Sequence, residues 1–174
     1  MNFRNARQDI FDEVCREGFN SDLGSFTQYY GGNALDASLL FIPLSGFLPA
    51  TDARVVGTIA ALERELLQDG LLLRYKPERE VDGLCGEEGV FLACSFWLAA
   101  VYQKMGRTDD ARRVFERAAS TCNDLGLLAE EYATNGRRQL GNFPQAFSHF
   151  ALVNAAFALA NTPEQPHLQG SPGE

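Results

Sequence analysis

Two adjacent carboxylates, Glu130 and Glu131, are the residues of this sequence whose types and position best suit chemistry. They lie on a predicted connection between an amphipathic helix that ends near Leu125 and an apolar helix that begins at Pro144. Connections held by rigid elements at both ends are where reactive side chains are commonly placed. The two neighbouring side chains are expected to point in different directions. A lone Glu-Glu pair is also typical of solvated loops, so the interpretation depends on the surrounding sequence.

The surrounding sequence resembles a known enzyme family. The run Leu128-Ala-Glu-Glu-Tyr132 is similar to the Ala/Ser-Glu-Glu/Gln-Tyr motif that closes the catalytic domain of glycoside hydrolase family 15, the glucoamylases and their trehalase relatives. The resemblance runs in unbroken order from near residue 4 to residue 160. Its other matching segments are Ser25–Gly32, Leu35–Leu40, Leu73–Tyr75, Gly86–Phe91, Cys94–Trp97 and Gly141–His149. The chain is therefore identified, by resemblance, as the C-terminal part of such a catalytic domain.

The resemblance implies an inverting hydrolysis. Glycoside cleavage uses two carboxyl groups, one that protonates the leaving oxygen and one that, in an inverting enzyme, activates a water molecule. Glu130 matches the family's general base, and Glu131 stands where the relatives carry Glu or Gln and is expected to contact substrate. The family's general acid lies in an earlier Trp-Glu segment, which this chain lacks. Ala133, where relatives often carry Asp, is a further departure.

Three more residues are expected to bind the sugar. Arg74 and Tyr75 match the Arg-Tyr of the glucoamylase sugar site, and a guanidinium suits bidentate bonding to hydroxyl or carboxylate groups. An ordinary surface arginine at a helix exit remains the alternative. Glu88 opens a predicted helix, whose dipole favours an anion, so it suits a substrate ligand better than a general acid, with simple helix capping as the alternative. Asp36 and His149 are interpreted as structural.

Composition limits the class of protein. The chain has 174 residues, 45% of them hydrophobic, which is enough for one globular domain. A net charge of −8 argues against a nucleic-acid or anionic-membrane surface. Neither a signal peptide nor a membrane span is indicated, so a cytoplasmic location is expected. No cofactor or metal is expected, and free thiols are predicted at all four cysteines, Cys15, Cys85, Cys94 and Cys122.

Hydrophobic periodicity predicts an all-α fold with six helices. They are expected at residues 2–17, 33–44, 51–69, 89–105, 108–125 and 144–161, with Asn33 and Thr108 as N-caps and with Thr51 and Asp52 at the start of the third helix. The first, third and fifth are apolar on one side, whereas the second, fourth and sixth are apolar nearly all round. The second set is therefore expected to be much less exposed than the first. Short β pieces are possible near residues 71–75.

This alternation agrees with two concentric layers of helices. Three such hairpins make half of the (α/α)6 toroid that the resemblance implies, which would occupy residues 1–162, with a flexible tail at 163–174. Because Met1 stands where the second half of the ring would begin, a C-terminal fragment, a split gene product or a degraded reading frame is expected. Half a ring leaves apolar flanks uncovered, so self-association or binding to a chain that carries the first half is expected.

Three functions remain open. The first is the base-carrying half of a glucoamylase-like hydrolase acting on α-glucoside oligosaccharides, inactive when isolated. The second is the trehalase variant, which differs in taking a disaccharide. The third, of another class, is a tetratricopeptide-like helical-repeat binding protein, because six residues fit that spacing: Leu98, Ala99, Tyr102, Ala111, Phe115 and Ala118. Steps of 34 residues recover no second copy, although repeat arrays need about three units.

Overall fold

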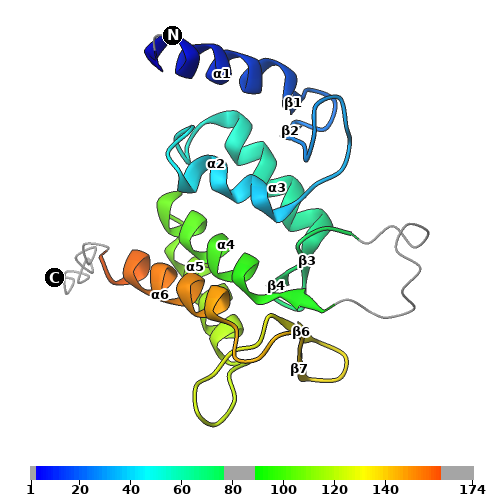
Figure 1. Cartoon of the computed structure of the whole chain (residues 1–174), viewed down its shortest axis with the longest axis vertical. Coiled ribbons are helices and arrows are strands. Elements are labelled where there is room, and N and C mark those ends of the chain that lie inside the picture. The colour runs from blue at the N-terminus through cyan, green and yellow to red at the C-terminus, as the bar shows by residue number, and fades with distance from the viewer. Residues whose placement is uncertain (1–2, 77–88, 162–174) are drawn as a thin grey trace, which may run out of the picture.

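The computed structural model describes residues 3–76 and 89–161, and these ranges contain six α-helices and one 3-10 helix (Figure 1). The helices are α1 (Phe3–Glu17), η1 (Ala37–Leu40), α2 (Phe41–Leu44), α3 (Ala53–Leu66), α4 (Leu92–Lys104), α5 (Thr108–Ala119) and α6 (Ala146–Ala160). They follow one another along the molecule, from α1 at one end to the packed group of α4, α5 and α6 near the other. Glu88, Cys85 and the predicted tail lie outside the described residues.

Short antiparallel strands join the helices. They are β1 (Phe19–Asn20), β2 (Ser25–Phe26), β3 (Leu67–Gln68), β4 (Leu71–Leu72), β5 (Val90–Phe91), β6 (Glu131–Ala133) and β7 (Arg138–Leu140). They form the pairs β1–β2 and β3–β4 and a three-stranded sheet of order β5-β6-β7. In Figure 1 the strands gather along one edge of the molecule, on the right. The β4 strand falls where short β pieces were expected, whereas the β6–β7 hairpin was not predicted.

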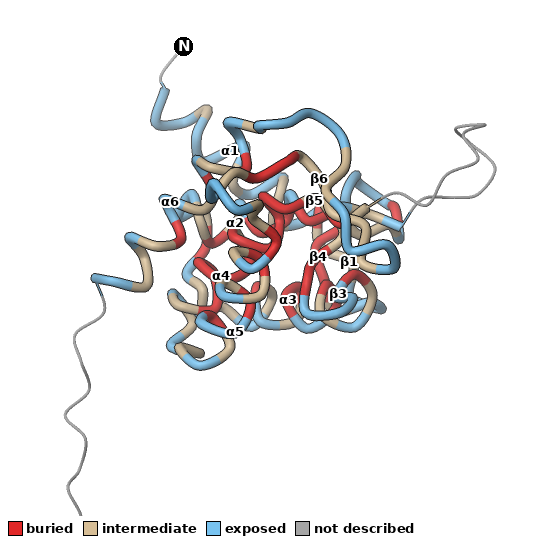
Figure 2. The backbone as a smooth tube through the Cα atoms, turned by 90° about the horizontal axis from the view of Figure 1, so that it is seen from below, coloured by how far each residue is buried: buried red, intermediate tan, exposed pale blue. Residues whose placement is uncertain are grey.

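The centre of the core is α4, which packs against α5, α6 and the η1–α2 segment. Ten of its thirteen residues are buried, as the all-round apolar pattern predicted, and they appear red in the interior of Figure 2. The ring of Phe96 meets that of Phe115 on α5 edge-on at 5.6 Å. The helix starts at Leu92, three residues later than predicted, because Val90 and Phe91 pair with β6 instead.

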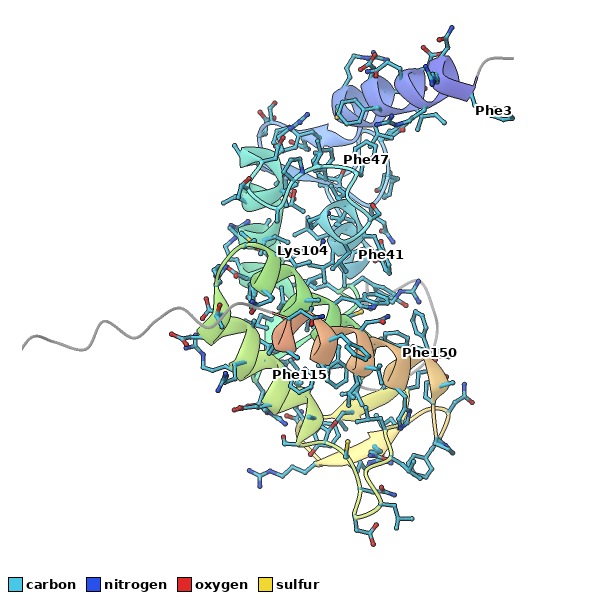
Figure 3. The ribbon with its side chains drawn as sticks, turned by 90° about the vertical axis from the view of Figure 1, so that its left-hand side faces the viewer. Phe3, Phe41, Phe47, Lys104, Phe115 and Phe150 are labelled. Carbon is cyan, nitrogen blue, oxygen red and sulfur yellow. The ribbon has the colours of Figure 1, made fainter. Side chains whose placement is uncertain are left out.

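The sixth helix departs from its predicted burial. Its small residues Ser148, Ala151 and Ala155 are buried, but its large apolar residues face outward. Phe147, Phe150, Val153 and Phe157 are 45%, 68%, 45% and 65% exposed and form what we call the α6 outer face (Figure 3 labels Phe150). The expected exposure order is therefore wrong for α6, since α3 has six buried residues and α6 three. A helix apolar all round needs cover on more than one side, and the described residues supply one.

The second predicted helix is shorter than expected. It begins after Asp36, whose side chain accepts a hydrogen bond from Ser38 N–H and so caps η1. Asn33, the predicted cap, instead accepts a hydrogen bond from the side chain of Asn20. Residue 34 is held in a non-helical pairing, because its carbonyl accepts from Gln28 N–H at 2.9 Å. Local side-chain acceptors thus set the helix start, as they commonly do.

The fifth helix ends earlier, at Ala119 rather than near Leu125, and its N-cap is Arg107 rather than the predicted Thr108, which is its first residue. Its C-terminal side is diverted by Asn123, whose Oδ1 accepts from Leu125 N–H at 3.0 Å and Leu127 N–H at 2.8 Å. An asparagine side chain that bonds the backbone two residues on forms a turn in place of helix. The connection from α5 to β6 is thereby shaped as a tight loop that leads to the carboxylate pair.

The thiols fit their predicted state. Cys15, Cys94 and Cys122 are free, and Cys94 is fully buried. Burial raises the pKa of the Cys94 thiol and of the Cys122 thiol. Because the thiolate is the reactive form, both groups are expected to be unreactive at neutral pH.

Asp52 gives a stability prediction. It caps α3, whose start was predicted at Thr51 and Asp52, and its hydrogen bonds with Arg54 lower its pKa from 3.8 to about 2. A carboxyl group whose folded-state pKa is depressed stabilises the fold above its unfolded pKa, and that contribution is lost as pH falls towards 2. Asp52→Ala is expected to lower the free energy of unfolding at pH 7 by about 1 kcal/mol. Urea unfolding at pH 7 and pH 3 measures this, with a smaller difference from wild type at pH 3. Equal stability at pH 7, or a difference that grows in acid, would contradict the assignment.

Candidate active site

Glu130 lies immediately before β6, where two parts of the chain hold its backbone. Its carbonyl accepts from Leu92 N–H, at the start of α4, at 3.1 Å. Its own N–H donates to the carbonyl of Asn142 at 3.0 Å. The most buried helix of the core and the segment that leads into α6 thus fix the position of this residue between them.

The Glu130 side chain is partly buried and is bound through one oxygen. Its Oε2 accepts from the backbone N–H of Asn142 at 3.2 Å and from Asn142 Nδ2 at 3.1 Å. Among the described residues, none donates a hydrogen bond to Oε1. A carboxylate fixed at one oxygen with the other unbonded can accept a proton from a water molecule, which is the task of a general base.

Glu131 points elsewhere, as expected for neighbours on a strand. Its Oε2 accepts from Gly89 N–H at 3.1 Å, and its Cα pairs with that of Phe91 across the β5–β6 ladder. A Cβ on Gly89 would lie 3.0 Å from the backbone of Tyr132, so glycine permits this close approach. Glu131 is therefore tied to the residue that follows the predicted ligand Glu88, which itself lies outside the described ranges.

Arg74 follows β4 and reaches the same part of the molecule. Its guanidinium carbon lies 6.0 Å from the centre of the Phe91 ring, and its Nε lies 3.9 Å from Oδ2 of Asp36. The Arg74 side chain is 59% exposed, whereas that of Asp36 is 5% exposed. The carbonyl of Arg74 accepts from Ala37 N–H at 2.7 Å, which anchors the backbone. Asp36 thus has the predicted structural role at η1 and also pairs with the predicted sugar ligand.

Phe91 connects the two groups of predicted residues. The Arg74 guanidinium lies over its ring, and its strand neighbour across the ladder is Glu131. Its ring also lies 6.2 Å from that of Phe147, which in turn lies 5.5 Å from Trp97. The structure therefore places Arg74 and Glu131 next to Phe91, whereas the Glu130 side chain lies at Asn142. Apolar ring faces beside a few polar groups are the usual lining of a small-molecule site.

Tyr75 lines a different part of the surface. A cavity of about 730 Å³ is bounded by Leu23, Gln28, Asn33, Ala34, Leu35, Ala61, Arg64, Glu65, Leu66, Tyr75 and Lys76. Glu130, Glu131 and Arg74 are not among these residues, so this cavity is distinct from the carboxylate pair. Arg74 and Tyr75 are neighbours in the chain, and the guanidinium carbon of Arg74 lies 5.8 Å from the centre of the Tyr75 ring.

Sequence reasoning did not assign roles to Asn142, Phe91 or Phe147. Asn142 and Phe147 lie inside the matching segment Gly141–His149, and Phe91 ends the segment Gly86–Phe91, so the signal that could have found them was present. Asn142 contacts Glu130, and Phe91 contacts Arg74 and Phe147. These residues are far apart in the sequence and meet only because the chain reverses between them. His149 is satisfied as predicted, because its Nε2 accepts from Leu128 N–H and its Nδ1 bonds the carbonyl of Gln145.

The described ranges contain neither a membrane-spanning helix nor a metal-binding cluster. No helix there is both long enough and apolar enough to cross a membrane. Residues 3–76 and 89–161 also contain no group of three or more His, Cys, Asp or Glu side chains placed to hold a metal ion.

A family model and several curated proteins match this chain. The model of "Glycosyl hydrolases family 15" matches residues 2–157. The chain is 44% identical over 168 residues to trehalases from Mycobacterium tuberculosis and Mycolicibacterium smegmatis, covering 97% of this chain and 25% of each of those proteins. It is 42% identical over 154 residues to the trehalase of Thermoplasma volcanium, covering 88% of this chain and 24% of that protein.

The fold has solved relatives as well. A structure named "Glycosidase Wild Type" superimposes with a TM-score of 0.75 at 24% sequence identity, over 91% of this chain and 44% of that chain. The chain spans about a quarter of the length of the curated relatives and less than half of this glycosidase. Its six helices therefore form a half-toroid. Because the family model matches nearly the whole chain and curated members are more than 40% identical to it, this chain belongs to glycoside hydrolase family 15.

Proposed function

We propose that this chain is the base-carrying part of an inverting glycoside hydrolase, and that its substrate is the disaccharide trehalose. The observation that carries the proposal is the Glu130 carboxylate, fixed at Oε2 and unbonded at Oε1 within the described structure. The substrate assignment follows the names of the curated relatives, which are trehalases. Among the functions open from sequence, the family membership favours a hydrolase over a helical-repeat binder.

In this mechanism Glu130 acts on water. The water oxygen bonds to the anomeric carbon while the bond to the leaving glucose breaks, and Oε1 of Glu130 takes the proton that the water loses. A second carboxyl group protonates the leaving oxygen, and we assign that group to a part of the ring outside residues 1–174. Arg74, held beside Asp36, binds sugar hydroxyl groups, and Glu131, Tyr75 and Glu88 are assigned to the same task.

The α6 outer face is assigned to the rest of the ring. Four exposed apolar side chains in a row on one helix mark an interface more often than a free surface. The chain spans only about a quarter of its curated relatives, so those proteins have further chain outside the matched part. We assign the face to the remaining part of a family 15 domain, in the same or a separate polypeptide.

The substrate can be tested in what we call the completed enzyme. It consists of residues 1–174 mixed with the Mycolicibacterium smegmatis trehalase made without its 168 matching residues. We expect glucose release from trehalose with a kcat/KM about tenfold or more above that from maltose, because a site that bonds specific hydroxyl groups rejects a sugar that misplaces them. A preference for maltose would favour the glucoamylase-like alternative. A folded complex that releases glucose from neither sugar would contradict the proposed function.

A further inference from the structure

The segment of residues 141–149 forms hydrogen bonds with the backbone of Leu128 and Ala129, the two residues that precede Glu130. The bonds to the preceding residues are Leu128 N–H to His149 Nε2 at 3.3 Å, Gln145 N–H to Leu128 O at 2.8 Å and Ser148 Oγ–H to Ala129 O at 2.8 Å. The first turn of α6 thus fixes the approach of the chain to the carboxylate. Because this turn packs on the buried α4, its own position is set by the core.

Asn142 is the member of this segment that touches the Glu130 carboxylate itself. Its backbone N–H and its Nδ2 both donate to Oε2, and its carbonyl accepts from the Glu130 N–H. Three hydrogen bonds between the same two residues fix both the backbone and the side chain of the glutamate. Hydrogen bonds to a carboxylate are stronger than those between neutral groups, so this arrangement favours one position of the Glu130 side chain.

We infer that Asn142 is a positioning residue for the general base: it holds Oε2 of Glu130 so that Oε1 is left to take the proton of the attacking water. This inference rests on the proposed function, because it assigns a purpose to Asn142 only if Glu130 is the base. Asn142 itself exchanges no proton and forms no bond to the sugar. Its effect is geometric, since displacing a reacting group by about 1 Å can lower a rate by about 100-fold.

Gly141 makes the close approach of Asn142 possible. Its φ is +73°, and a Cβ there would lie 2.8 Å from Oε2 and 3.0 Å from Cβ of Glu130. Any side chain at this position would therefore displace the carboxylate. Gly126 offers a matched control, because its φ is +76° but a Cβ there would meet nothing within 4 Å. The two glycines share the backbone conformation and differ in whether the added carbon would reach Glu130.

The first test uses residues 1–174 alone. Urea unfolding is measured for wild type, Asn142→Ala, Glu130→Ala and the double variant. If the two side chains are bonded, Asn142→Ala lowers the unfolding midpoint in the wild-type background and has a much smaller effect once Glu130 is removed. Asn161→Ala, at the end of α6, is the control and should act equally in both backgrounds. Additive effects of Asn142→Ala and Glu130→Ala would overturn the contact.

The second test uses the completed enzyme and trehalose. Asn142→Ala is expected to lower kcat by up to about 100-fold with KM little changed, because sugar binding does not involve this residue. Gly141→Ala is expected to lower kcat similarly, and Gly126→Ala is expected to leave it unchanged. Unchanged kcat in Asn142→Ala, while Glu130→Gln abolishes turnover, would overturn the positioning role alone. Turnover that survives Glu130→Gln would instead overturn the proposed function, and a change confined to KM would mark Asn142 as a substrate ligand.

Discussion

In the completed enzyme, Glu130→Gln is expected to lower kcat for trehalose by about 10²–10⁴-fold, the range in which loss of a general acid or base usually falls. The amide has the shape of the carboxylate, and its oxygen can still accept the hydrogen bonds of Asn142. It cannot take a proton from water. KM is therefore expected to change little, which separates a lost base from a lost sugar contact. Initial rates of glucose release over a range of trehalose concentrations give both constants.

Two neighbouring variants control this prediction. Glu131→Gln is expected to raise KM more than it lowers kcat, since Glu131 is assigned to substrate and bonds Gly89 instead of Asn142. Glu116→Gln, on an exposed position of α5, is expected to have no effect on either constant. A Glu130→Gln enzyme with the wild-type kcat would contradict the base assignment, and a Glu131→Gln enzyme without activity would move that role to Glu131.

The second large effect concerns the isolated chain. Residues 1–174 alone are expected to hydrolyse trehalose at least about 10²–10⁴-fold more slowly than the completed enzyme, because the general acid is assigned to the missing part. Missing sugar contacts would lower the rate further. The α6 outer face should be needed for residues 1–174 to assemble with the rest of the ring. The double variant Phe150→Asp, Phe157→Asp should therefore prevent assembly of the completed enzyme. Size-exclusion chromatography and glucose assays of each mixture measure both effects.

The control for the face is Val56→Asp, which places the same charge on an exposed residue of α3. This variant should still assemble into the completed enzyme. If the isolated chain runs as a dimer that Phe150→Asp dissociates, a second copy covers the face when the rest of the ring is lacking. Robust turnover by an isolated monomer would contradict the assignment of the general acid to another part of the ring.

Much of the fold was predictable because helices leave a periodic signal. The predicted positions of α1, α3, α4 and α6 differ from the structure by only a few residues, and the predicted start of α3 at Thr51 and Asp52 includes its N-cap. The early end of α5 was missed because one side chain, Asn123, bonds two backbone N–H groups and diverts the chain. Such a competition between side chain and helix is decided by local geometry that periodicity does not report.

The exposure of α6 shows a different kind of limit. Its sequence predicts a helix that is covered nearly all round, but only its small residues are buried, and Ala151 and Ala155 among them pack with residues of α4. The sequence pattern does not say which chain segment supplies the remaining cover. The family resemblance does, because it assigns only half of a ring to these residues. The spacing that resembles a tetratricopeptide repeat lies on α4 and α5. These two helices form a closely packed pair, and α6 packs against both of them.

The site was partly predictable for the same reasons. The motif around Glu130 was identified from its residues, but the hairpin that follows it was not, because strands of three residues are too short to give an alternating pattern. That hairpin reverses the chain and returns Asn142 to Glu130. The contact therefore joins residues twelve positions apart. The turn between the two strands contains Asn135-Gly136, a typical hairpin signal that sequence reasoning did not use.

The base role of Glu130 is tested most directly by fluoride release from α-glucosyl fluoride in the completed enzyme that carries Glu130→Ala, measured with and without sodium azide. Fluoride leaves without protonation by a general acid, so its release does not depend on the second carboxyl group. Azide attacks without losing a proton, so it can replace the water that Glu130 would otherwise activate. The account predicts slow release in buffer, faster release with azide and a β-glucosyl azide product, as expected when attack comes from the face opposite the departing group. Release in buffer at the wild-type rate, without any effect of azide, would contradict it.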